Sequence, residues 1–245
     1  MFNKFYSEGY NCLLMRPKHL KFPFIWEERK PMLYEGVLIV PQYYDQHEKW
    51  EVPKGLFPKE GPICIEYCSG NGDWVIQRAQ KDPSQFWIAV EMQFKRVRKI
   101  WSKMHNLSVK NLLIVCGEAQ TFTKYYLPKN SVDEVYVNFP DPWPKDRHAK
   151  HRLIQKSFVD ELADVVKTGG NAIYATDDAA YSAQMIKVML SHEHWKPCFP
   201  KPYYIQQWED YGHSWFENLW REKERGFFYM QFCSTQKKSG PSLST

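Results

Sequence analysis

The sequence predicts an α/β fold with a doubly wound, mostly parallel sheet, and two observations support this prediction. Between Pro62 and Leu190, short apolar runs of strand composition alternate with longer stretches that have apolar residues at helical spacing. Strands that alternate with helices are typical of parallel sheets. After about Trp195 this alternation ends. Two later runs of strand composition, Tyr203–Trp208 and Phe227–Phe232, predict an antiparallel pair at the sheet edge.

The alternating region is expected to hold five strands and four helices. The expected strands are Ile63–Tyr67, Gln85–Glu91, Asn111–Cys116, Val132–Asn138 and Asn171–Thr176. The expected helices are Trp74–Lys81, Phe94–His105, Leu153–Lys167 and Ala179–Leu190. Gly169 and Gly170 would end the third helix, since glycine commonly follows a helix C-terminus.

The chain divides into three expected segments. Residues 1–60 lack a clear period apart from a short strand at Tyr34–Val40, and this arm would either cover the sheet or reach a substrate. Residues 61–234 would form the domain. Residues 235–245, rich in Ser and Lys, would form a flexible tail.

Composition limits the class of protein. The 245 residues can bury a sizeable core, and the net charge of +5 permits a nucleic-acid partner without requiring one. The six cysteines show no C-x-x-C pair and no zinc spacing, so we expect no metal site and buried thiols at Cys64 and Cys116. The sequence shows no signal segment and no apolar run of about 18 residues, so we expect a cytoplasmic protein with no membrane partner. We further expect a monomer or a homodimer.

One loop, from Asn138 to Arg152, has an unusual composition, N-F-P-D-P-W-P-K-D-R-H-A-K-H-R. Its three prolines exclude a regular helix at that point, and the residues before them, Phe139, Asp141 and Trp143, should be extended. A helix would begin at about residue 148. Because the loop follows a strand, it should lie where an open α/β sheet forms its ligand crevice.

Asp141 is the one carboxylate among the prolines, and basic residues follow it. Such a pattern indicates an anionic polymer brought to a carboxylate-bearing site, although a solvated surface loop would also fit. Trp143 would either form a wall of a base pocket or wedge the loop in place. The basic residues of the loop are Lys145, Arg147, His148, Lys150, His151 and Arg152.

A glycine-containing turn follows the first expected strand, with the sequence E-Y-C-S-G-N-G from Glu66 to Gly72. Gly70 and Gly72 allow a tight turn and the close approach of a ligand to the backbone. The third glycine of the dinucleotide fingerprint, expected near Val75, is absent. The turn alone is therefore weak evidence for a nucleotide site.

Two further acids strengthen that evidence. Glu91 ends the second strand about 20 residues further on, where a carboxylate can accept hydrogen bonds from both ribose hydroxyls. Glu118 follows the third strand beside Gly117, where it could meet an adenine amino group. Three successive strands that end in acids indicate a nucleoside-containing cofactor, either a nicotinamide dinucleotide or S-adenosylmethionine.

These residues resemble the bacterial tRNA (guanine-N7-)-methyltransferase family, over about Ile63 to Phe232. The most specific part of this resemblance is the loop sequence N-F-P-D-P-W-P-K-D-R-H-A-K-H-R, which is similar to the family's N-F-x-D-P-W-x-K-x-R-H-x-K-R-R. The resemblance implies a Rossmann-like class I methyltransferase fold. It also implies transfer of a methyl group from S-adenosylmethionine to N7 of a guanine in tRNA, giving 7-methylguanosine.

The resemblance assigns roles to individual residues, with Asp141 as the catalytic one. It implies cofactor binding by Glu66, Gly70, Gly72, Glu91, Glu118 and Asp141. It implies substrate binding by Lys145, Asp177, Ser214, Trp215, Phe216 and Glu217. It implies RNA contacts by Arg147, His148, Lys150, His151 and Arg152. Glu118 and Ser214 stand where the family usually has Asp and Thr.

The chemistry of guanine N7 fits this set of residues. N7 carries a free lone pair and no proton at neutral pH, so its attack on the methyl group needs no general base and depends on positioning. Asp141 would accept a hydrogen bond from the guanine edge and stabilise the positive charge that develops on the ring. The basic residues would bind phosphates, which gives affinity without sequence information.

Two alternatives stay open. A nicotinamide-dependent oxidoreductase could share the fold class, but the missing third glycine and the basic loop argue against it. A non-catalytic RNA-binding relative could keep the fold, but the combination of Glu66, Glu91 and Asp141 argues against it.

Overall fold

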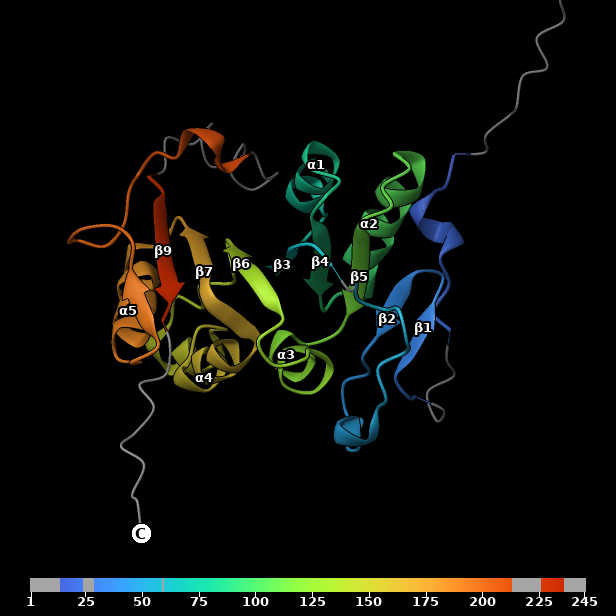
Figure 1. Cartoon of the computed structure of the whole chain (residues 1–245), viewed down its shortest axis with the longest axis horizontal. Helices are drawn as coiled ribbons and strands as arrows, with labels where there is room; N and C mark the ends of the chain where they lie inside the picture. The colour runs from blue at the N-terminus through green and yellow to red at the C-terminus, as the bar shows by residue number, and fades with distance from the viewer. Residues whose placement is uncertain (1–13, 24–28, 59, 213–225, 236–245) are drawn as a thin grey trace, which may run out of the picture.

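The computed structural model describes residues 14–23, 29–58, 60–212 and 226–235, and a large β-sheet forms its centre (Figure 1). The strands are β1 (Met32–Tyr34), β2 (Val37–Ile39), β3 (Ile63–Tyr67), β4 (Phe86–Glu91), β5 (Leu112–Cys116), β6 (Val132–Asn138), β7 (Val166–Thr176), β8 (Trp195–Pro197) and β9 (Phe228–Ser234). The α-helices are α1 (Asp73–Lys81), α2 (Phe94–Asn106), α3 (Ala119–Tyr126), α4 (Lys156–Val165) and α5 (Ala179–Leu190). Short 3-10 helices are η1 (Pro17–His19), η3 (His47–Lys49), η4 (Asp146–His151) and η5 (Glu209–Tyr211).

The strand order is β1-β2-β5-β4-β3-β6-β7-β9-β8. From β2 to β7 every pairing is parallel, whereas β1 and the β9–β8 edge are antiparallel. The predicted doubly wound, mostly parallel sheet with an antiparallel C-terminal edge is therefore confirmed. Parallel strands end at the same edge, so the segments that follow β3, β4, β5, β6 and β7 gather there.

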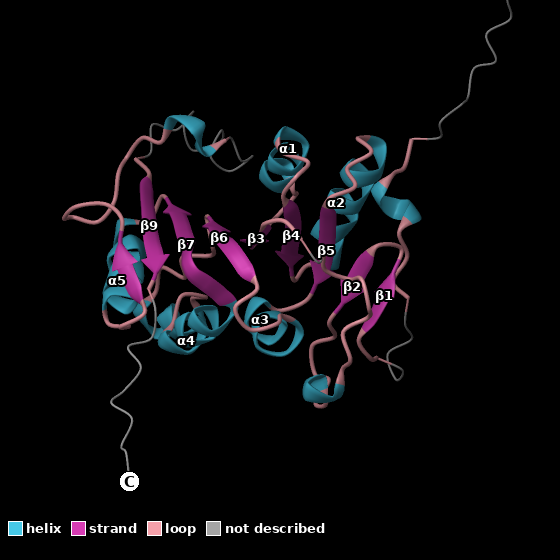
Figure 2. Ribbon diagram, in the orientation of Figure 1, coloured by secondary structure: helices cyan, strands magenta, loops and turns pink. Residues whose placement is uncertain are grey.

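Helices cover both faces of the sheet (Figure 2). Helices α1 and α2 pack on one face, and α3, α4 and α5 pack on the other. Because helices cover both faces, β3 and β5 are buried along their whole length, and their residues are mainly apolar, with Glu66 as the one residue of a charged type. On α2 the buried residues Val97, Ile100, Trp101 and Met104 form one stripe, as their helical spacing predicts.

Several element boundaries differ from the prediction. The single strand expected at Tyr34–Val40 is instead the hairpin β1–β2, which pairs with β5 and extends the sheet. Its turn is formed by Glu35 and Gly36, with φ angles of 51° and 76°. Two successive positive φ angles are the requirement of the tightest hairpin turn. The predicted boundary at residue 61 stays a prediction.

The expectation that Gly169 and Gly170 end a helix is wrong. Helix α4 ends at Val165, and both glycines lie within β7, where the pairing with β6 has an irregularity between Val132 and Glu134. A Cβ atom on Gly170 would lie 2.6 Å from the backbone oxygen of Asp133. The glycine therefore marks a close backbone approach inside a sheet.

Two more expectations need correction. The run Tyr203–Trp208 is not a strand, and only Ile205 forms a bridge, with Tyr229. Strand β9 already pairs with β7 on one side, and β8 occupies the end of its other side. Helix α3 was not predicted, although a parallel connection from β5 to β6 requires a crossover. The predicted burial of Cys64 and Cys116 as free thiols is confirmed.

Within the described ranges, none of the helices combines the length and the apolar character that crossing a bilayer requires.

Candidate cofactor and RNA site

Three of the predicted acids lie at the carboxyl edge of the sheet, at the ends of the neighbouring strands β5, β4 and β3 (Figure 1). Glu66 lies at the end of β3 and Glu91 at the end of β4, with 2% and 5% of their surfaces exposed. Glu118 follows β5 and is exposed at the start of α3, where its Oε2 accepts a hydrogen bond from Thr121 Oγ1 at 2.6 Å.

Only one of the two carboxyl oxygens of Glu66 has a hydrogen-bond partner among the described residues. Its Oε1 accepts a hydrogen bond from Asn138 Nδ2 at 2.8 Å. Its Oε2 is buried and has no hydrogen-bond partner within the described part of the chain. Burial, with a smaller contribution from the charge of Glu91, raises the pKa of this carboxyl to about 8, so Glu66 is mostly protonated at pH 7 in the absence of a ligand. A buried polar atom without a partner is a place where a ligand can form a hydrogen bond.

The Glu91 carboxylate is held in one position by backbone donors. Its Oε2 accepts from the Gly70 amide at 2.9 Å, and its Oε1 accepts from the Gln93 amide at 2.8 Å. Arg96 Nη1 lies 3.7 Å from Oε2. Each carboxylate oxygen has a second lone pair, so Glu91 can still accept hydrogen bonds from a ligand.

Glycine is required at Gly70 and at Gly72 for different physical reasons. Both have positive φ angles, 56° at Gly70 and 77° at Gly72, which favour glycine. Gly72 is also the N-cap of α1, and a Cβ atom there would lie 2.7 Å from Ile100 Cγ1. The structure thus explains Gly72 by the packing of the turn against α2, whereas Gly70 orients the Glu91 carboxylate.

The proline loop has an unexpected backbone. Phe139 and Trp143 have φ angles of 48° and 42°, so the expectation that they are extended is wrong. The Phe139 amide donates to the Ala175 oxygen at 2.8 Å, and its ring packs edge-on against Phe227. Such left-handed positions cost about 1–3 kcal/mol and persist only where surrounding contacts impose them. The strained loop presents Asp141 at the surface.

Arg152 is one of those contacts. Only 9% of its surface is exposed. Its Nε donates to the Pro142 oxygen at 2.7 Å, its Nη2 lies 3.4 Å from the Trp143 oxygen, and its Nη1 donates to Gln184. The guanidinium also stacks over the Tyr181 ring. Arg152 was predicted to contact RNA, but its donors are directed at the protein, where they hold the loop.

The other basic residues lie on η4 or, for Lys145, directly before it. This 3-10 helix replaces the α-helix expected from about residue 148. Lys145, Arg147, Lys150 and His151 are exposed, and His148 is half-buried. The Trp143 ring lies 5.9 Å and 5.3 Å from the two histidine rings. Trp143 therefore wedges the loop against η4 and still exposes part of its surface.

The remaining predicted substrate residues are less defined. Asp177 follows β7 at the same edge and is half-buried. Ser214, Trp215, Phe216 and Glu217 lie outside the described residues.

Sequence reasoning did not assign Asn138 and Tyr211. The Tyr211 hydroxyl donates to Asn138 Oδ1, and the Tyr211 oxygen accepts from Trp74 Nε1 at 2.7 Å. A buried hydrogen-bonded chain thus links Glu66 to the segment before residue 213. Asn138 could have been recognised as the first residue of the proline-loop pattern, whereas no sequence pattern indicated Tyr211.

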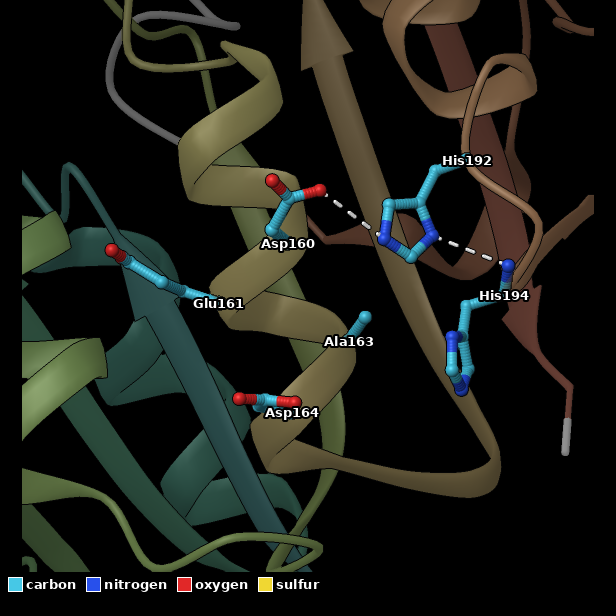
Figure 3. A pocket seen from close by; sticks show the side chains of 6 residues that line it. All are labelled: Asp160, Glu161, Ala163, Asp164, His192 and His194. Carbon is cyan, nitrogen blue, oxygen red and sulfur yellow. Dashed lines mark hydrogen bonds and ion pairs between the residues drawn. The ribbon is translucent and has the colours of Figure 1, made fainter. Parts of the chain in front are cut away.

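A cavity of about 240 Å³ lies elsewhere, between α4 and the turn after α5 (Figure 3). Asp160, Asp164, His192 and His194 are among the residues that line it, and His192 Nε2 lies 3.3 Å from Asp160 Oδ1. Because β7 begins where α4 ends, this cavity is at the opposite edge of the sheet from the acids. Among the described residues, no group of three or more His, Cys, Asp or Glu could hold a metal ion.

Comparison with known proteins gives the same class. Residues 60–230 match a family described as "Putative methyltransferase". The chain is 51% identical over 220 residues to the tRNA (guanine-N(7)-)-methyltransferase of Chlamydia muridarum, covering 89% of this chain and 97% of the relative. It is 48% identical over 228 residues to the enzyme of the same name from Chlamydia pneumoniae, covering 92% and 100%.

Solved structures with low sequence identity share the fold. The 16S rRNA methyltransferase KamB is 16% identical, with a TM-score of 0.57 over 76% of this chain and 96% of that one. The aminoglycoside resistance methyltransferase NpmB1 is 17% identical, with a TM-score of 0.54 over 76% and 95%. At these identities the likeness concerns the class I methyltransferase fold alone.

Proposed function

Because the chain belongs to the tRNA (guanine-N(7)-)-methyltransferase family, we propose how its residues serve that family's reaction. The enzyme transfers a methyl group from S-adenosylmethionine to N7 of a guanine in tRNA. The observation that carries the assignment is the pair of buried acids at adjacent strand ends, Glu91 fixed by two amides and Glu66 with one oxygen unpartnered.

The residues at the carboxyl edge fit S-adenosylmethionine. Glu66 Oε2 would form a hydrogen bond with the cofactor, and Glu91 would accept hydrogen bonds from its ribose. Glu118 would accept a hydrogen bond from the adenine amino group. Gly70, which has no side chain, would let the cofactor approach the backbone of the turn closely. When bound, S-adenosylmethionine supplies an electrophilic methyl group on a positively charged sulfur. The positive charge of the cofactor favours a site rich in carboxylates.

Asp141 is assigned to the guanine. The loop holds it at the carboxyl edge beyond β6. The Phe139 contact to Ala175 fixes the loop before Asp141, and the Arg152 contacts to Pro142 and Trp143 fix it after Asp141. Its carboxylate would accept a hydrogen bond from the guanine N1–H or amino group. It would also stabilise the positive charge that develops on the ring as N7 is methylated. No protein group needs to remove a proton from N7.

The phosphate contacts are assigned to the exposed part of the basic loop. Lys145, Arg147 and Lys150 are exposed cations on or beside η4, and His148 and His151 lie next to them. Arg152 is assigned to loop support in place of RNA contact. Asp177, Ser214, Trp215, Phe216 and Glu217 remain proposals for the grip on the guanine nucleoside.

Two finer statements are also proposals. The enzyme is expected to act in the cytoplasm, in keeping with its tRNA substrate and with the free buried thiols Cys64 and Cys116. It is expected to be a monomer or a homodimer, which light scattering after size-exclusion chromatography would decide. A nicotinamide-dependent oxidoreductase, one of the alternatives, has no support from the relatives.

The choice of atom can be tested with altered RNA. Purified enzyme would be incubated with labelled S-adenosylmethionine and tRNA transcripts made with guanosine or with 7-deazaguanosine, which lacks N7. The guanosine transcript should take up methyl groups, and the 7-deaza transcript should take up none. Equal uptake by both transcripts would refute methylation at N7.

A further inference from the structure

Helix α2 concentrates positive charge. Its 13 residues include five cations and no acid, while the whole chain has a net charge of +5. The remainder of the chain is therefore close to neutral. The cations are Lys95, Arg96, Arg98, Lys99 and Lys103.

This arrangement is unfavourable for the helix by itself. Lys95, Lys99 and Lys103 are spaced four residues apart, so like charges lie one above the other on one face, which costs a few tenths of a kcal/mol for each pair. Lys95 and Arg96 also lie in the first turn, which contains no acid, at the positive end of the helix dipole. An anionic partner would offset both costs.

Three of the five cations have contacts within the protein. Arg96 lies near Glu91, and Arg98 Nε donates to the Pro17 oxygen at 2.5 Å. Lys103 donates to the Asn71 oxygen at 2.9 Å and pairs with Asp73. Lys95 and Lys99 form no ion pair with any described residue, and Lys95 is exposed.

A second basic segment lies along the same helix. Met15 bonds to Ser102 and Asn106, Pro17 to Arg98, and the Phe22 ring packs on Phe94. Residues 15–22 therefore run antiparallel to α2, and Figure 1 shows this segment beside the helix. The exposed Lys18 and Lys21 therefore lie near the first turns of α2. We name this surface the α2 basic face, and it comprises Lys18, Lys21, Lys95 and Lys99.

The helix that carries the α2 basic face begins next to the cofactor site. Helix α2 begins three residues after Glu91, and Lys103 contacts the glycine turn after β3. The basic loop follows β6, on the other side of β3. The glycine turn thus lies between two basic segments. An anionic polymer bound at Asp141 and long enough to cross the turn would meet both.

We propose that the α2 basic face is a second docking surface for the phosphate backbone of tRNA, opposite to the basic loop. This proposal rests on the proposed function, because it takes tRNA as the polymer at Asp141. Lysines bind phosphate as point charges and carry no sequence information. The face therefore contributes affinity and orientation to every tRNA, without selecting one.

The test compares two double variants. Lys95→Gln with Lys99→Gln removes two charges from the face. Lys187→Gln with Lys196→Gln removes two exposed lysines from α5 and β8, at the far side of the sheet. Dissociation constants for unmodified tRNA would be measured over a range of salt concentrations. Affinity for S-adenosylhomocysteine and methyl transfer at saturating tRNA would be measured for each variant.

The α2 variant should bind tRNA about tenfold more weakly near physiological salt, with a salt dependence shallower by about 1.5 in log–log slope. Its cofactor affinity and its rate at saturating tRNA should match the wild type, and the control should bind tRNA like the wild type. Equal tRNA affinity of the two variants would overturn the docking surface. Binding of each variant to anionic phospholipid vesicles would also be measured. If the α2 variant bound such vesicles more weakly but bound tRNA like the wild type, the docking surface would be overturned as well. Failure of the wild type to methylate tRNA would instead refute the proposed function.

Discussion

Replacing Glu66 with Gln should change how the stability of the enzyme depends on pH. Burial holds the pKa of Glu66 at about 8, against 4.5 for an unperturbed Glu. Between these values the folded state binds a proton that the unfolded state releases, so stability falls as pH rises. The contribution is fully present below about pH 4.5 and is lost once pH passes about 8. Gln cannot ionise, so the variant lacks this dependence.

The expected magnitude follows from the width of the window. Each pH unit between the two pKa values lowers wild-type stability by about 1.4 kcal/mol. From pH 5 to pH 7 the stability difference between Glu66→Gln and the wild type should therefore shift by about 3 kcal/mol in favour of the variant. The lowered pKa values of His47 and His192 act on both proteins equally and cancel in the comparison.

The assay is urea unfolding of the cofactor-free protein, with tryptophan fluorescence as the readout. The unfolding curve is measured at several pH values from 5 to 8. The exposed Glu193→Gln serves as the control, and its difference from the wild type should stay nearly constant. A Glu66→Gln difference that is also independent of pH would refute the assignment of Glu66 as a neutral buried acid.

Three further predictions concern the turn and the loop. Gly72→Ala should destabilise the protein by about 2–4 kcal/mol in urea unfolding, from a left-handed backbone and a clash with Ile100. The control Gly169→Ala has the same backbone region but open space, and a loss equal to that of Gly72→Ala would contradict the clash. Arg152→Lys should cost about 2 kcal/mol of stability and lower the methyl-transfer rate more than tRNA affinity, whereas lost affinity alone would indicate a phosphate contact. Asp141→Asn should reduce turnover about 100-fold or more with tRNA affinity retained, and near-normal turnover would contradict its assignment.

The parallel core could be predicted because local pattern and tertiary environment agree there. Strands β3 and β5 are buried on both faces, which favours apolar residues, and apart from Glu66 their sequences are apolar or nearly so. The acids could be predicted for the same reason. Once the strands are ordered, Glu66 and Glu91 must lie at the shared carboxyl edge.

The proline loop could not be predicted in detail, because distant contacts determine it. The residue before a proline avoids the helical region, yet Phe139 and Trp143 adopt left-handed angles. The deciding contacts involve Ala175 and Arg152, which are separated in sequence from the residues they hold. Arg152 itself looks like one more cation in a basic run, and only its burial reveals its structural role.

The same limit applies to glycine. Gly169 and Gly170 follow a helical pattern and therefore resemble a helix stop, but the backbone of Asp133 approaches Gly170 from a neighbouring strand. Tyr211 joins the Glu66 network across a large separation in sequence, and no local pattern marks it.

The most direct measurement is nucleoside analysis of unmodified tRNA after incubation with labelled S-adenosylmethionine and either wild-type enzyme or Asp141→Asn. The account predicts that the wild type places the label in 7-methylguanosine and that the variant, though it still binds tRNA, places almost none there. Label in another methylated nucleoside, or full 7-methylguanosine formation by the variant, would contradict the assignment of Asp141 to the guanine.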